Sequence, residues 1–108
     1  MKKRKFKLWY YTVSHKQALL RSIGRENSKN IDVYFGDVSY IELPTVMDGI
    51  EIVKPTLEDE VYINRKIENS NQKITVLNVG DKKFYIVSSV VKIMRNNLSV
   101  FELPFDIV

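Results

Sequence analysis

Two stretches of the chain are written in nearly the same way, and this similarity constrains the fold more than any other feature of the sequence. Residues 31–44 read IDVYFGDVSYIELP and residues 91–104 read VKIMRNNLSVFELP, and the two align without a gap. Serine, glutamate, leucine and proline recur at equivalent positions near the end of both stretches. A recurrence of this kind indicates a repeated supersecondary unit.

Each stretch carries turn-forming residues at its centre, Gly36-Asp37 in the first and Asn96-Asn97 in the second. Glycine and asparagine accept the positive φ that two-residue hairpin turns require. We therefore predict a tight β-hairpin in each stretch. Because opposite residues of a hairpin share a face, we expect the apolar faces that begin at Ile31 and at Val91 to enter the core.

A weaker similarity extends the two stretches towards the N-terminus, where KLWYYTV resembles KITVLNV. We therefore hypothesise an internal repeat of residues 7–44 and 73–104, joined by residues 45–72. Each copy is expected to form a four-stranded meander, and short β-rich strings that look alike by chance are the alternative. The predicted class is mainly β (α+β), a single domain of 108 residues with an open barrel or a sandwich and one helix.

The predicted helix lies near residues 56–68. Thr56 is a suitable N-cap, and Asp59 follows it three residues later in an acidic first turn. Arg65 and Lys66 stand near the other end, where cations complement the helix dipole. Apolar side chains gather on one side of this segment, so we expect the helix to pack on the sheet.

Residues 15–23 allow two interpretations. Ser14 and Gln17 have the spacing of a capping box and Gly24 could end a helix, but the apolar run also suits a strand. We favour the strand, because a helix of this length would have fewer than three turns and little stability of its own.

Composition places the chain among globular proteins and excludes several classes. It is 44% hydrophobic and 28% charged, which argues against disorder. The chain has no cysteine, which excludes a disulfide framework and thiolate metal sites and favours a cytoplasmic location. No apolar run approaches the ~20 residues of a membrane span, so we expect no membrane partner. The sequence style suggests a small bacterial protein, and no motif predicts a cofactor or metal.

The positive charge of the chain is concentrated at one end. Residues 1–7 hold five of the 17 basic residues, whereas the rest of the chain has 12 basic and 13 acidic residues. Basic side chains neutralise phosphates and aromatic rings stack on bases, so this N-terminal arm is a candidate nucleic-acid site. Its proposed binding residues are Lys3, Arg4, Lys5, Lys7 and Trp9. The alternative is a strand with one buried side, since Phe6 alternates with lysines.

Glu42 and Glu102 recur in the two similar stretches, each at the end of a predicted apolar face. If the repeat has twofold symmetry, the two carboxylates could approach one another and perform acid–base chemistry or bind a cation. The alternative is that each glutamate marks the rim where the sheet meets water. His15, the only histidine, is expected to be an exposed turn residue without a catalytic role.

No catalytic motif or phosphate-binding glycine loop stands out, which favours a function without catalysis. We expect a protein-binding module whose partner is another protein or a second copy of the chain, because the second faces of the predicted hairpins are half apolar. Nucleic-acid binding by the basic arm is the first alternative. A small enzyme that uses Glu42 and Glu102 is the second.

Overall fold

A computed structural model of the protein describes residues 3–24, 28–68, 71–99 and 101–105. This part of the chain contains seven strands and one helix. The elements are β1 (Lys5–Thr12), β2 (Gln17–Ser22), β3 (Asn30–Glu42), β4 (Val46–Asp48), β5 (Glu51–Val53), α1 (Leu57–Lys66), β6 (Lys73–Val79) and β7 (Lys82–Asn96). The expectation of a mainly β protein with one helix is confirmed, and β2 confirms the strand interpretation of residues 15–23.

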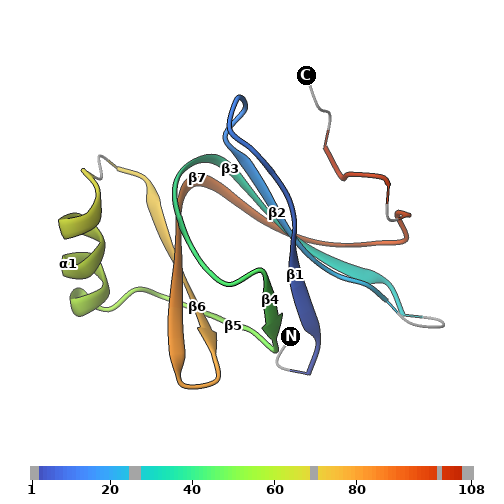
Figure 1. The fold of residues 1–108 in the computed structure, drawn as a ribbon, viewed down its shortest axis with the longest axis horizontal. Coiled ribbons are helices and arrows are strands. Elements are labelled where there is room, and N and C mark those ends of the chain that lie inside the picture. The colour runs from blue at the N-terminus through green and yellow to red at the C-terminus, as the bar shows by residue number, and fades with distance from the viewer. Residues whose placement is uncertain (1–2, 25–27, 69–70, 100, 106–108) are drawn as a thin grey trace.

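The strands form one antiparallel sheet in the order β4-β1-β2-β3-β7-β6-β5. The sheet curls into a half-barrel, in which β3 and β7 run together as a long arc across the middle (Figure 1). Their pairing extends from Asn30 opposite Asn96 to Glu42 opposite Tyr85. The curled sheet corresponds to the open barrel among the predicted architectures, because no second sheet faces it in the described residues.

The main core fills the inner side of this curl. Alternate residues of the central strands point inward, and register places Leu20 opposite Val33 and Ala18 opposite Phe35. All four are fully buried, and Phe6 joins them from β1. Burial of each large apolar side chain contributes about 1.5–3 kcal/mol, so these cross-strand layers hold the curl together.

Helix α1 covers the outer face of β6 and β7 at one end of the sheet (Figure 1). Its Ile63 packs there against Val76 and Val87. The predicted cap is present as a reciprocal pair, since Asp59 N donates to Thr56 Oγ1 at 3.2 Å and Thr56 N donates to Asp59 Oδ2 at 2.8 Å. The helix prediction is thereby confirmed, and none of the helices in the described residues is long and apolar enough to cross a membrane.

The first predicted hairpin is wrong, because β3 continues as one strand through Gly36-Asp37. Pairing with β7 along nearly its whole length outweighs the local preference for a turn. Gly36 serves close packing instead: a Cβ there would lie 3.0 Å from the Tyr34 hydroxyl and 3.3 Å from Cβ of Val90. Asp37 has a φ of 53°, and the register shifts just beyond it at a β-bulge.

The second predicted hairpin is also wrong. Strand β7 ends at Asn96, and residues 97–99 and 101–105 form no strand. The Asn96 side chain closes the strand end locally, because its Oδ1 accepts a hydrogen bond from Leu98 N at 3.2 Å. The predicted core face that starts at Val91 is also incorrect, since Val91 is only partly buried and Ile93 is 54% exposed.

The two similar stretches therefore adopt different structures. The span 7–44 contains most of β1 with β2 and β3, whereas the span 73–104 contains only β6 and β7. Neither span forms the predicted four-stranded meander. Ser99 and residues 101–104 of the second SxxELP string lie outside any strand, whereas residues 39–42 of the first belong to β3.

Candidate nucleic-acid interface

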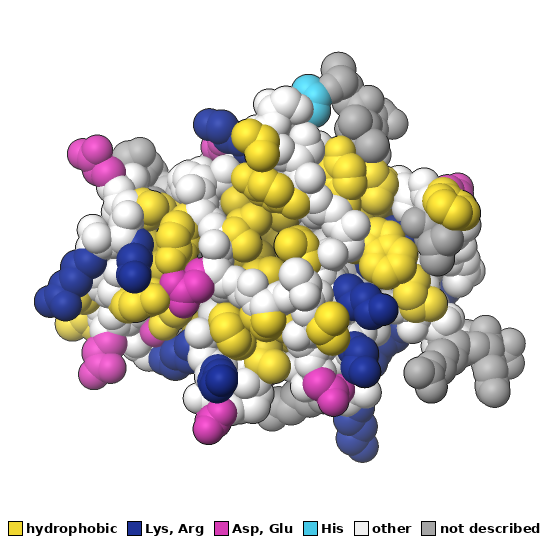
Figure 2. All heavy atoms as spheres, viewed as in Figure 1, with side chains coloured by type: hydrophobic (Ala, Val, Ile, Leu, Met, Phe, Trp, Pro, Cys, Tyr) yellow, Lys and Arg dark blue, Asp and Glu magenta, His cyan; other side chains and the backbone are white. Residues whose placement is uncertain are grey.

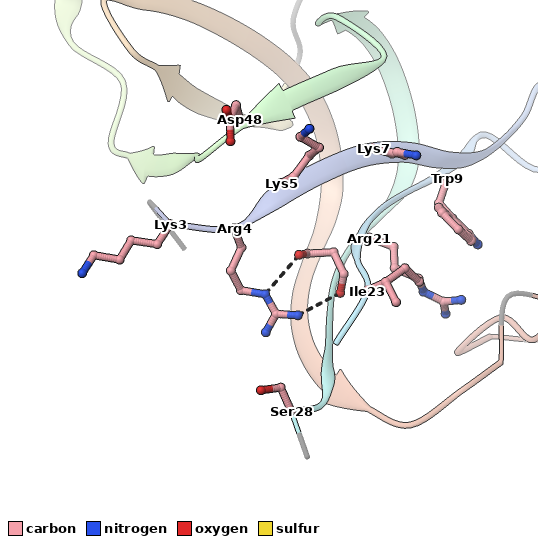
Figure 3. Close-up of a pocket in the computed structure, with 10 residues that line it drawn as sticks. Lys3, Arg4, Lys5, Lys7, Trp9, Arg21, Ile23, Ser28 and Asp48 are labelled. Carbon is pink, nitrogen blue, oxygen red and sulfur yellow. Dashed lines mark hydrogen bonds between the residues drawn. The ribbon is translucent and has the colours of Figure 1, made fainter. Parts of the chain in front are cut away.

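An open pocket of about 730 Å³ lies at the end of the sheet where β1 begins (Figure 3). All five residues proposed from the sequence for nucleic-acid binding line it, together with one further arginine: Lys3, Arg4, Lys5, Lys7, Trp9 and Arg21. The rest of its wall is formed by Ser22, Ile23, Ser28 and Asp48. Figure 2 shows basic side chains gathered at this end of the molecule.

The basic segment is part of the sheet rather than a free arm. From Lys5 onward it is strand β1, which pairs with β2 on one side and with β4 on the other. Phe6 points inward opposite Met47 and is fully buried, while Lys5 and Lys7 are exposed. The prediction of an arm over residues 1–7 is corrected here from Lys5 onward, and residues 1–2 lie outside the described part of the chain.

Arg21 shares the pocket with the lysines of β1 because of a bulge at Trp9. The pairs from Tyr10 to Thr12 keep one register with β2, and the register shifts by one between Leu8 and Tyr10. The shift places Arg21 directly opposite Lys7. Without the bulge the turn register would place Ser22 there, and Lys7 would lie on the opposite face of the sheet from Arg21, because a one-residue slip inverts every side chain of the shifted strand. Arg21 could not be predicted from the sequence for this reason.

A buried ion pair anchors Arg21. Its Nε donates to Asp32 Oδ1 at 2.7 Å and its Nη2 donates to Asp32 Oδ2 at 2.9 Å, and both side chains are 0% exposed. Asn96 Nδ2 also donates to Asp32 Oδ2, at 2.8 Å. The Arg21 guanidinium lies 5.6 Å from the centre of the Trp9 ring, within the range of a cation–π contact. The arginine thus connects the aromatic wall of the pocket to the sheet.

Arg4 is held differently, by neutral oxygens. It donates to Ser22 Oγ at 3.0 Å and to the carbonyl oxygens of Ser22 and Lys29 at 3.2 and 3.1 Å, and the two bonds to Ser22 are visible in Figure 3. These contacts fix the guanidinium without cancelling its charge. Asp48, opposite Lys5 on β4, is the one carboxylate among the described residues of the pocket wall. Basic side chains therefore dominate the pocket, which favours an anionic ligand.

The structure does not bring Glu42 and Glu102 together. Glu42 ends β3 beside α1, where its Oε1 accepts hydrogen bonds from the hydroxyls of Tyr40 at 2.6 Å and Tyr62 at 2.7 Å. Glu102 accepts from Ser99 N at 2.9 Å, in the segment whose Ser99 carbonyl contacts Arg21. This backbone bond lowers the pKa of Glu102. The predicted carboxylate pair is therefore not formed.

A second polar cluster fastens α1 to the sheet. Asp59 accepts hydrogen bonds from the Tyr85 hydroxyl at 2.8 Å and from Lys83 Nζ at 3.2 Å. Burial opposes ionisation of Asp59, but the Thr56 amide, Tyr85 and Lys83 outweigh it and lower its pKa to about 2. The bond to Glu42, with burial, raises the pKa of Tyr40 to about 12. Both carboxylates thus have structural partners that fix the helix.

The single histidine and the side chains that could ligate a metal ion form no further site in the described part of the chain. His15 is exposed in the turn between β1 and β2. Across the described residues, no group of three or more histidine, cysteine, aspartate or glutamate side chains has an arrangement that could hold a metal ion.

No protein-family model, no curated protein and no solved structure matches this chain.

Proposed function

We propose that the protein binds single-stranded nucleic acid along β1, with phosphates on the lysines and a base on Trp9. One observation carries the proposal: all five residues marked from the sequence line one pocket, and Arg21 joins them there. The sequence alone favours a protein-binding module, with nucleic-acid binding as the first alternative. The shared pocket reverses this order, because it gathers the basic residues and Trp9. The proposed setting is the cytoplasm, in keeping with a chain that has no cysteine.

The strand geometry supports phosphate contacts. Lys5 and Lys7 are two residues apart on β1, so their stems leave the same side of the strand about 7 Å from one another. Lys3 precedes them and lines the same pocket, although its side chain extends away from Trp9 in Figure 3. A row of flexible ammonium groups binds phosphates by charge without reading the sequence of bases.

Trp9 supports a single-stranded ligand. An aromatic face stacks on an unpaired base and contributes about 1–3 kcal/mol per base. Trp9 is partly exposed in the bulge of β1 and is backed by the guanidinium of Arg21. Paired bases of a duplex cannot reach such a ring without unstacking, so affinity for single strands should exceed affinity for duplexes.

The test is the salt dependence of binding to a fluorescently labelled oligothymidine, measured by anisotropy. Lys5→Gln with Lys7→Gln removes two ammonium groups whose loss does not touch the core. The expected result is weaker binding and a salt slope reduced by about 0.7 for each lost phosphate contact. Truncation before Leu8 is unsuitable, because it also removes the fully buried Phe6.

The matched control is Lys66→Gln with Lys82→Gln, which removes the same charge from exposed lysines of α1 and β7. This control should keep the salt slope of the unmodified chain. Equal losses in the two double variants would show that binding follows net charge alone, and the proposed interface would then be wrong.

A further inference from the structure

We propose that the free edge of β7 binds an extended acidic segment of a partner protein as an added strand. Strand β6 pairs with β7 only from Lys82 to Ser88. Beyond Ser88, β7 continues to Asn96 with β3 on one side (Figure 1). On the other side, no strand among the described residues pairs with it. This observation is independent of the basic pocket at the start of β1.

An open strand edge is a template for strand addition. Alternate residues of 91–95 direct their backbone N–H and C=O groups away from β3, where an incoming strand can satisfy them. Natural edges of this kind are usually short, covered or bulged, because they otherwise pair with other chains. Main-chain hydrogen bonds would supply affinity, and pockets for alternate side chains would supply specificity.

An apolar groove of about 550 Å³ lies beside this edge. Its apolar walls come from β5, β6 and β7 and the residues that follow β5, among them Ile52, Ile74, Val91 and Ile93. Val91 and Ile93 share the inner face with Phe35 and Val33, which lie opposite them. Val33 is fully buried, yet Ile93 is 54% exposed. An added strand would cover Ile93 with its own inward side chains.

The positive charge around the groove and the β7 edge indicates which kind of partner can bind there. Lys54 and Lys73 line the groove, Lys92 and Arg95 stand exposed on β7, and no carboxylate is among the described residues that line the groove. An acidic segment therefore complements the edge. If two copies of the chain paired through this edge, the positive charges of Lys92 and Arg95 in one copy would approach those in the other. This repulsion opposes self-association. The expected ligand presents apolar side chains to Ile93 on the inner face and acidic side chains to Lys92 on the outer face, and Arg95 adds positive charge at the inner side of the edge.

The probe is a capped peptide of about nine residues, the length of a long natural strand, in which valine alternates with glutamate. Binding is followed by fluorescence anisotropy, and amide hydrogen exchange of residues 91–95 is followed by NMR. We expect slower exchange of alternate amides in this stretch when the peptide is bound, because they gain hydrogen-bond partners. A peptide that alternates valine with lysine should bind at least about tenfold more weakly.

Ile93→Glu places a carboxylate in the groove and should weaken binding of the glutamate peptide by about tenfold or more. Val13→Glu is the matched control, since it makes a similar change at a 75% exposed residue in the β1–β2 turn. Reversal of the edge charge by Lys92→Glu with Arg95→Glu should transfer preference to the lysine peptide. Circular dichroism would show that each variant folds.

Three results would overturn the proposal. The first is equal binding of the glutamate and lysine peptides. The second is binding without slower exchange in residues 91–95. The third is a dimer in sedimentation that Ile93→Glu dissociates and Val13→Glu does not, which would assign the edge to a second copy of the chain. None of these results depends on whether the basic pocket binds nucleic acid.

Discussion

The guanidinium of Arg21 lies between the ring of Trp9, whose centre is 5.6 Å away, and the carboxylate of Asp32, to which its Nε donates at 2.7 Å. Arg21 and Asp32 have no exposed side-chain surface, whereas Trp9 stands in the wall of the basic pocket. The guanidinium that contacts the aromatic ring is thus held in place by an ion pair inside the sheet. The proposed ligand site and the buried part of the sheet therefore share this arginine.

Replacement of Asp32 by alanine should destabilise the protein by about 3–5 kcal/mol, because it leaves the charge of Arg21 buried without its partner. Urea unfolding followed by circular dichroism measures this loss. The double variant Arg21→Met with Asp32→Leu removes both charges and should recover most of the free energy of unfolding. A double variant as unstable as Asp32→Ala alone would show that lost packing, not the unpaired charge, is the cause.

The capping carboxylate Asp59 should make stability depend on acid pH. Its pKa is lowered from 3.8 to about 2, so its contribution is present above pH 3.8 and is lost as the pH falls through about 2. Asp59→Asn should lower the free energy of unfolding by about 2 kcal/mol at neutral pH, because it loses charged hydrogen bonds from Lys83, Tyr85 and the Thr56 amide.

The difference between Asp59→Asn and the unmodified chain should shrink as the pH approaches 2. Urea denaturation over this pH range measures both curves. A difference that stays constant down to the lowest pH would contradict the assigned role of the carboxylate.

Glu42 should control the ionisation of Tyr40. The hydrogen bond to Glu42 and burial raise the pKa of Tyr40 from 10.0 to about 12, so its contribution to stability is present below pH 10.0 and is lost as the pH rises through about 12. Glu42→Gln should return this pKa towards 10.0. Absorbance titration, with Tyr40→Phe to identify the signal, measures it. An unchanged titration in Glu42→Gln would rule out the carboxylate as the main cause.

Features set by neighbouring residues could be predicted from the sequence. The Thr56 and Asp59 spacing defines the helix start, because a cap requires only residues within one turn. The alternation of Phe6 with Lys5 and Lys7 likewise gave the two faces of β1. Five of the six basic and aromatic residues of the pocket wall were named from the composition of the N-terminal segment, as a nucleic-acid site that stays a prediction.

Features set by distant pairing could not be predicted in the same way. Gly36-Asp37 has the composition of a turn, but β7 provides a partner along nearly the whole strand, and β3 continues through these residues with a bulge. Arg21 was missed because the bulge at Trp9 depends on how β1 meets β2. The open edge of β7 was also outside local reasoning, because it follows from where β6 begins.

The proposed function requires that Trp9 stacks on a base of a single-stranded nucleic acid, and the fluorescence of Trp9 is a direct probe of this contact. Trp9 is the only tryptophan, so its emission reports on this ring alone. Titration with unlabelled oligothymidine at low salt should quench the emission to a plateau, and added salt should reverse the quenching. Emission that does not change while a labelled strand binds would place the ligand elsewhere, and an absence of binding at low salt would contradict the proposed function.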